Sequence, residues 1–437
     1  MTALTRGKPA AGAHAARPAG GRAPRRLPRP VAFYLLASII VSFLAGSSAP
    51  TPLYAVYASR WGFSPITTTV VFGVYALAVL TALLTVGSLS DHTGRRPVLL
   101  AAIAIQALVM VVFTTADGVP QLLIARIIQG LSTGAAAGAI GAGMLDLNKA
   151  KGTIANAVAP ITGTASGALG SGLLVQFLPQ PTHLVYLVLL GVFLIQGLGV
   201  ALMPETSAPQ PGALASIRPT FAMPPQTRRP LLLAVPALVA VWALAGLYGA
   251  LGPALVRLVS GSGSIVLGGL SLAVLAASGA VAVLALQKQS PRTLTLVGGA
   301  ALIAGVGLTV LSVRFGSVAG FFVGTAIAGV GFGGGFQGAI RSVVPLAAPH
   351  QRAGVLSVVY VVSYLAMGLP AVIAGFVLVH EGDLLATAAQ YGVAVMVLAA
   401  LALLGAVRPG REAAPAPVPV PGPADRRGPE CPTAAVR

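Results

Sequence analysis

The sequence predicts an all-α integral membrane protein with twelve transmembrane helices arranged in two pseudo-symmetric six-helix bundles. Three observations support this fold class. Only 8% of the 437 residues are charged, whereas a soluble domain carries about 25%. Apolar runs of about 20 residues, enough to cross a ~30 Å hydrocarbon core, recur twelve times. A glycine pattern in the first half of the chain also returns in the second half.

The apolar runs give the order of the elements. Six runs form the predicted N-terminal bundle, residues 31–203, and six form the C-terminal bundle, residues 231–407. Residues 204–230, rich in Pro, Gly and Arg, predict a flexible linker. Residues 1–30 and 408–437 contain too little apolar surface to fold, and we expect both to be disordered. The expected spans are 31–57, 66–90, 97–115, 119–145, 153–178, 183–203, 231–256, 263–286, 293–313, 317–343, 353–379 and 385–407.

The internal repeat lies in the fourth and tenth spans. Gly130 and Gly134 align with Gly329 and Gly333 at one common offset of 199 residues. Such a distance is typical of transporters built from two related halves. Gly130, Gly134 and Gly138 recur at every fourth position, a pattern that lets two helix backbones approach closely in lipid. Static packing and a sliding surface both fit this pattern.

Basic residues predict the orientation. All but four of the 27 Lys and Arg residues fall in the termini and in alternate loops. Arg126 lies within a span, and Arg60, Arg257 and Arg314 lie in the other loops. Because basic residues accumulate on the cytoplasmic side, we expect both termini in the cytoplasm and the protein in the plasma membrane.

A charged turn separates the second and third spans, where residues 87–97 read GSLSDHTGRRP. Gly87 permits close helix contact, Gly94 permits a conformation that a Cβ opposes, and Asp91 can pair with Arg95. The segment resembles the signature loop of the major facilitator superfamily, GxLADxxGRR/KxxL, and departs from it only at Ser90. The chain most resembles the twelve-helix drug and metabolite efflux members of that family.

The fourth span contains a second resemblance. Residues 122–130 read LLIARIIQG and resemble the family motif LxxxRxxQG, which is linked to coupling in drug-proton antiporters. The resemblance implies that Arg126, Gln129 and Gly130 act in coupling or substrate binding. An arginine about 9 Å deep in a membrane is costly when its charge is uncompensated, and an ionisable group inside a membrane therefore indicates a function. The alternative is a structural arginine that snorkels to the surface or binds backbone carbonyls.

Two further segments support the resemblance. Residues 163–172 read GTASGALGSG and match the antiporter motif GxxxGPxxGG at Gly163, Gly167 and Gly172, but not at Ala168 and Ser171. This departure weakens the case for antiport. Residues 203–206, Met-Pro-Glu-Thr, resemble the sequence that often closes the sixth helix of the family.

The resemblance also implies a gate. Asp91, Arg95 and Asp146 are expected to form a cytoplasmic charge cluster that stabilises the outward-facing state, in a gating set completed by Gly87, Gly94 and Arg96. The alternative is a solvated surface triad that contributes little energy.

In the family, the first, fourth, seventh and tenth helices line the substrate cavity. Their polar and aromatic residues suit a hydrophobic or amphipathic solute. We therefore expect a secondary active transporter that exports such a molecule; import or facilitated transport of a small organic solute without proton coupling is the alternative. None of the nine acidic residues lies in the middle of a span, so coupling to a proton stays open. The candidate cavity residues are Ser47, Ser48, Thr51, Arg126, Gln129, Thr133, Trp242, Tyr248, Phe336 and Gln337.

Other classes of protein fit less well. A membrane enzyme needs catalytic groups gathered at one depth, and the five histidines are scattered. The scattered basic residues lack the interleaved aromatics of a nucleic-acid interface, and GGGFQG at 333–338 lacks the strand and acidic residue of a nucleotide site. We expect no cofactor, no metal and no nucleic-acid partner. The expected partners are the lipid bilayer, a small-molecule substrate and a possible proton, and the expected state is a monomer.

Overall fold

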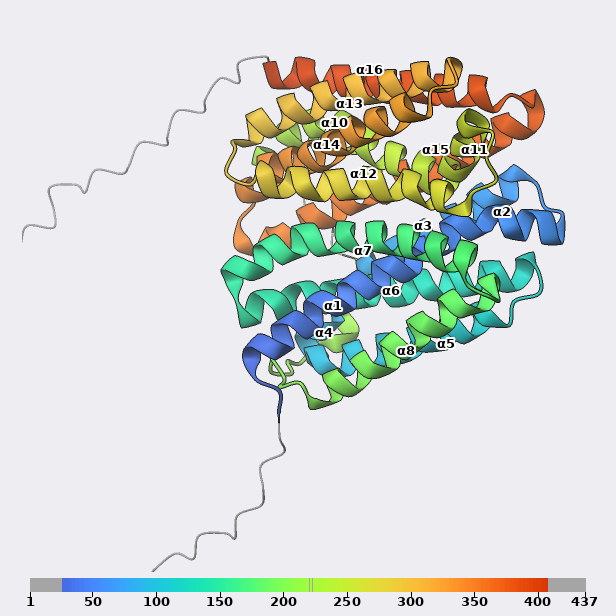
Figure 1. The fold of residues 1–437 in the computed structure, drawn as a ribbon. Helices are drawn as coiled ribbons and strands as arrows, with labels where there is room; N and C mark the ends of the chain where they lie inside the picture. Colours follow the sequence, from blue (N-terminus) through green and yellow to red (C-terminus); the bar gives the residue numbers. More distant parts are fainter. Residues whose placement is uncertain (1–25, 220, 222, 408–437) are drawn as a thin grey trace, which may run out of the picture.

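The computed structural model describes residues 26–219, 221 and 223–407, and within these ranges no strand is formed. The predictions for residues 1–25 and 408–437 lie outside the described residues. The helices run in one general direction across the molecule (Figure 1). They are α1 (Arg29–Ser48), α2 (Pro50–Trp61), α3 (Pro65–Thr85), α4 (Leu89–Thr93), α5 (Arg95–Thr114), α6 (Val119–Leu147), α7 (Lys149–Phe177), α8 (Pro181–Leu202), α9 (Ala213–Ser216), α10 (Pro225–Ala250), α11 (Gly252–Ser260), α12 (Ile265–Ala285), α13 (Pro291–Arg314), α14 (Val318–Val343), α15 (Arg352–Glu381) and α16 (Leu384–Val407), with 3-10 turns at Val344–Leu346 and Pro349–Gln351.

Twelve helices of the described chain are long and apolar enough to cross a membrane, which confirms the predicted fold class. The first span consists of α1 and α2 together, residues Arg29–Trp61. The others are α3, α5, α6, α7, α8, α10, α12, α13, α14, α15 and α16, the tenth continuing from α14 to Leu346.

Local sequence explains where the helices begin and end. Proline stands in the first turn of several spans, where its missing N–H is not needed; Pro65, Pro181 and Pro291 are examples. Glycine in the left-handed conformation ends α2 at Gly62 (φ 65°). Between α6 and α7 the side chain of Asn148 accepts a hydrogen bond from the N–H of Lys151 and so begins the new helix.

The helices fall into two packed groups, α1–α8 and α10–α16. Contacts between the groups are made chiefly by α7 with α12 and by α3 with α15 (Figure 1). We call the end of the bundle that carries α4 the Asp91 end, on the left of Figure 1, and the end that carries α2 and α11 the Thr51 end, on the right.

The segment between the two groups lies against the Asp91 end. Ser88 Oγ donates to the carbonyl of Ser216 at 3.0 Å, and the N–H of Gln210 donates to the carbonyl of His92 at 2.9 Å. The following helix α10 begins at Pro225 and includes Pro230 in its interior, so it starts before the predicted position 231. Pro230 has no N–H to donate to the carbonyl of Gln226, four residues earlier. Gln226 is exposed, so water can donate to that carbonyl instead.

Candidate functional site

The signature loop brings together the charged residues that the sequence singled out. Arg95 pairs through Nη1 with Asp91, and its Nε lies 3.4 Å from Asp146 Oδ2. Nη1 also donates to Ser90 Oγ at 2.8 Å. Arg95 is buried, and one carboxylate comes from α4 while the other comes from the last turn of α6. The cluster therefore ties the loop between α3 and α5 to the end of α6.

Glu205 completes this cluster from the other side. Its two carboxylate oxygens accept from the backbone N–H groups of Arg95 (2.8 Å) and Arg96 (3.0 Å). These N–H groups begin α5 and have no partner within the helix, and a negative charge at a helix N-terminus is favourable. Gly94 supports this geometry with φ 94°, and a Cβ there would lie 2.8 Å from Glu205 Oε2. Sequence reasoning placed Glu205 in the motif of residues 203–206 and missed this contact.

Arg126 is enclosed inside the first group of helices. The residue is 0% exposed, so it does not snorkel to the surface. Nη1 donates to the carbonyl of Ser47 and to Gln129 Oε1, each at 2.8 Å, and Nη2 donates to the hydroxyl of Tyr54. In this conformation Arg126 therefore joins α6 to the region where α1 meets α2.

Aromatic rings replace an acidic partner around the Arg126 guanidinium. Its Cζ lies 5.7, 5.2 and 6.0 Å from the ring centroids of Tyr54, Tyr75 and Phe113. Within the described residues the ion pairs involve Arg95 alone, and Arg126 Nε has no hydrogen-bond partner. Cation–π contacts in a desolvated site contribute about 2 kcal/mol. The rings lie on α2, α3 and α5, and periodicity alone did not indicate that they converge.

Gln129 satisfies a backbone carbonyl that has no partner within the first span. In a continuous helix the carbonyl of Gly46 accepts from the N–H of residue 50. That residue is Pro50, which has no N–H. Gln129 Nε2 donates to this carbonyl at 3.1 Å. The amide of Gln129 thus satisfies a buried backbone group with one end and Arg126 with the other.

The small residues of the sequence motifs lie at helix contacts. Gly130 and Gly134 on α6 pack against α3, and Gly138 meets the backbone of Gly87. On α7, Gly163 and Gly167 pack against α1. Gly172 instead lies against α12 of the other group, where an added Cβ would be 3.3 Å from the carbonyl oxygen of Ile265.

The hydroxyl residues expected in a substrate cavity make hydrogen bonds to carbonyl oxygens within the protein. Ser48 Oγ on α1 donates to Thr164 on α7 at 2.9 Å. Thr51 Oγ1 on α2 donates to the carbonyl of Gly249 on α10 at 3.3 Å and so joins the two groups. Ser47 and Thr133 donate to carbonyls of their own helices. Gln337 lies half-buried on α14. At the Thr51 end the two groups are therefore in contact.

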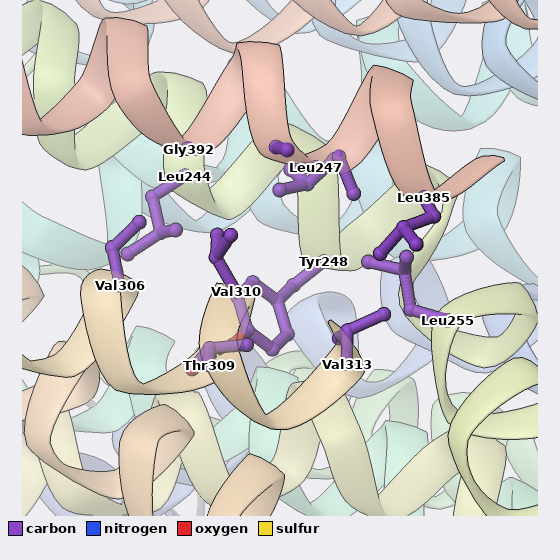
Figure 2. A pocket seen from close by; sticks show the side chains of 12 residues that line it. Leu244, Leu247, Tyr248, Leu255, Val306, Thr309, Val310, Val313, Leu385 and Gly392 are labelled. Carbon is purple, nitrogen blue, oxygen red and sulfur yellow. Dashed lines mark hydrogen bonds between the residues drawn. The ribbon is translucent and has the colours of Figure 1, made fainter. Parts of the chain in front are cut away.

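Tyr248 lies inside the second group rather than at the boundary between groups. Its hydroxyl is 2.8 Å from Thr325 Oγ1 and 3.5 Å from Thr309 Oγ1. It lines a cavity of about 20 Å³ (Figure 2), space for about one water molecule. The two threonine hydroxyls are the polar partners of the phenol on this side of α10. The cavity is otherwise lined by Leu244, Leu247, Leu255, Val306, Val310, Val313, Leu385, Ala388, Ala389 and Gly392.

Trp242 is the centre of an aromatic cluster on α10, α14 and α15. Its ring centroid lies 5.5 Å from that of Phe336, 6.4 Å from Phe332 and 5.3 Å from Tyr364. The Trp242 Nε1 is buried and has no hydrogen-bond partner in the described part of the chain. One turn beyond Tyr364, Gly368 packs against α3. The cluster therefore adjoins the boundary between the two groups. Sequence reasoning found Trp242 and Phe336 but missed the other two rings.

Two solved structures with the same fold are of transporters. A crystal structure of the nucleoside transporter NupG aligns with a TM-score of 0.64 and 12% identity, over 87% of this chain and 98% of that one. A bacterial homolog of the human lysosomal transporter Spinster, captured inward-facing and unoccupied, aligns with a TM-score of 0.67 and 13% identity, over 86% and 97%. At these identities the likeness shows the fold alone.

Sequence comparison gives the family directly. No curated protein matches the chain significantly. The family model of the Major Facilitator Superfamily matches residues 35–371, which include the charged cluster, Arg126 and Trp242. The chain therefore belongs to the major facilitator superfamily and is a multi-pass transmembrane transporter.

Proposed function

We propose that this transporter exports a hydrophobic or amphipathic small molecule by alternating access. In this proposal the protein lies in the plasma membrane and both of its termini lie in the cytoplasm. The observation that carries the proposal is the Trp242 cluster. Four aromatic rings offer apolar surface beside the boundary between the groups, and the indole N–H lacks a partner among the described residues. A solute with an apolar body and one hydrogen-bond acceptor complements such a site.

Alternating access is supported by the asymmetry between the two ends. The Thr51 end is joined by contacts between the groups, among them the bond from Thr51 to Gly249. At the Asp91 end, Arg95 and its two carboxylates link the loop to α6 within the first group. In the proposed cycle the Asp91 end corresponds to the cytoplasmic side. The cluster is intact here although the seam between α7 and α12 is open at that end, so we expect it to position the gating loop rather than to close the end by itself.

Transport without proton coupling is the second candidate, and the surroundings of Arg126 favour it. Proton-coupled carriers usually hold a titratable carboxylate where substrate and proton compete. Arg126 is instead surrounded by phenol, amide and carbonyl groups. A facilitator or importer of a small organic solute remains consistent with these contacts.

The test is transport into vesicles that contain the purified protein. A panel of lipophilic fluorescent solutes, with and without a hydrogen-bond acceptor, is followed with and without an imposed pH gradient. Trp242→Phe keeps an aromatic ring and removes the N–H, so we expect slower transport of the acceptor-bearing solutes only. Trp61→Phe is the matched control, because Trp61 lies at the end of α2, stacked on Tyr57. Equal effects of the two substitutions would reject the Trp242 site.

The pH gradient separates the two candidates. Gradient-driven accumulation that is lost in Arg126→Lys, with the protein still folded, supports coupling through Arg126, because lysine keeps the charge and loses the planar donor geometry. Equilibration that ignores the gradient supports facilitated transport and contradicts active export.

A further inference from the structure

A groove opens at the Asp91 end of the seam where α7 of the first group meets α12 of the second. Its volume is about 380 Å³, compared with about 20 Å³ for the cavity beside Tyr248. The lining is aliphatic apart from Lys151 and one threonine hydroxyl. It includes Val41, Lys151, Ile154, Ala155, Val158 and Leu284.

The same seam is closed at the Thr51 end. Gly269 lies directly against the backbone of Ala168, so α7 and α12 are in close contact there. Gln176 Oε1 accepts from Ser264 Oγ at 2.8 Å and from the N–H of Val266 at 3.0 Å. The space between the two helices therefore widens from the Thr51 end towards the Asp91 end.

Exposed apolar side chains border the groove, as expected of a surface that contacts the hydrocarbon of a membrane. Ile154 and Leu284, on its two sides, are 45% and 42% exposed, and Phe177 further along α7 is 70% exposed. The one hydroxyl in the lining, that of Thr162, already donates to the carbonyl of Val158 at 3.0 Å. The interior of the groove therefore presents no unsatisfied polar side chain, and it suits a hydrocarbon chain.

The charge at the mouth of the groove is positive. Lys151 is exposed and belongs to the lining, and no ion pair in the described residues includes it. Lys149 begins α7, and two further basic residues follow α12 at this end: Lys288 in the turn after α12 and Arg292 in the first turn of α13. Asp146, the acidic residue closest in sequence, is held in the ion pair described above. An anionic group at the membrane surface complements this end.

We propose that the groove binds one phospholipid with an anionic headgroup, taken from the leaflet at the Asp91 end. One acyl chain lies between α7 and α12, and the headgroup contacts Lys151. Because the lining comes from both groups of helices, the lipid occupies space that must be emptied before this end of the seam can close. Binding therefore favours the conformation seen here over one in which the Asp91 end is shut.

The experiment measures quenching of a tryptophan placed in the groove by Leu284→Trp. The protein is reconstituted in phosphatidylcholine vesicles that contain increasing fractions of brominated phosphatidylglycerol or of brominated phosphatidylcholine. Quenching of Trp61 and Trp242, measured in the parent protein, is subtracted. One basic residue at an anionic surface corresponds to about fivefold tighter binding, so we expect half-maximal quenching at about a fivefold lower fraction of phosphatidylglycerol.

Three variants decide between specific binding and general attraction. Lys151→Gln should remove the preference for phosphatidylglycerol, whereas Lys149→Gln, the same charge change two residues away and outside the lining, should keep it. Ala155→Phe should fill the groove and reduce quenching by both lipids. Equal quenching by the two lipids, or equal effects of the two lysine substitutions, would overturn the proposal. Displacement of the brominated lipid by millimolar inorganic phosphate would also overturn it, because the site would then recognise phosphate alone.

Discussion

Replacing Gln129 by leucine should destabilise the protein by about 2 kcal/mol. The substitution removes the donor to the carbonyl of Gly46 and the acceptor of Arg126 Nη1, which are separate hydrogen bonds of 3.1 and 2.8 Å. Hydrogen bonds between membrane helices contribute about 0.6 kcal/mol on average and at most about 1.7 kcal/mol, and a charged donor adds to this. About 1 kcal/mol for each bond gives the total.

A second substitution tests the cause of this loss. Pro50→Ala restores an N–H at residue 50, which can then bond to the carbonyl of Gly46 within the helix. In that background Gln129→Leu should cost about 1 kcal/mol less, because only the bond to Arg126 is lost. The coupling free energy of this double-mutant cycle is the quantity to measure.

Reversible unfolding of the purified protein in mixed micelles, followed by circular dichroism, gives the free energies. Gln106→Leu is the matched control: Gln106 is also a fully buried glutamine of the first group, but neither of its side-chain polar atoms has a hydrogen-bond partner in the structure. Its replacement should be neutral or stabilising. If Gln129→Leu lowers the free energy of unfolding equally with proline and with alanine at position 50, Gln129 does not compensate for the N–H that Pro50 lacks.

Three further predictions concern the stability of the first group, measured by the same unfolding assay. Glu205→Ala should cost about 1 kcal/mol, as loss of a helix cap does, and Glu205→Gln less; no change would mean that the carboxylate does not hold the start of α5. Gly94→Ala should cost about 1–3 kcal/mol because of its φ of 94°, and a wild-type value would show that the loop relaxes freely. Gly167→Ala should destabilise because its Cβ would overlap the carbonyl of Ala45, whereas Gly170→Ala, with open space around it, should not; equal values would contradict the close contact of α1 and α7.

The fold could be predicted because membrane-spanning helices can be recognised from few properties of the sequence. A span needs about 20 apolar residues whatever its neighbours are, so length and composition suffice to place it. The charged cluster was predictable for a related reason: Asp91 and Arg95 are four residues apart, and Asp146 ends the next but one span at the same side of the membrane. Topology places these three side chains at one side of the membrane, and the resemblance to the family implied that they meet, as found.

Contacts that depend on side-chain direction could not be predicted. The rings that surround Arg126 come from three helices, and their convergence depends on how each helix is rotated about its axis. Tyr248 shows the same limit, since a difference in rotation decides whether it faces the boundary or Thr325. The role of Gln129 was within reach of sequence reasoning, because Pro50 indicates one unsatisfied carbonyl four residues earlier.

The docking of the connecting segment has a mechanical consequence. Gln210, Pro211 and Ser216 are hydrogen-bonded to Ser88 and His92, so the segment between α8 and α10, residues 203–224, is not free along its whole length. Only residues 217–224 remain between the docked part and α10, and at ~3.5 Å per residue they can extend no further than roughly 28 Å. Any movement of the second half that exhausts this reach would pull on the loop that holds Asp91, so the connecting segment can transmit force to the proposed gate.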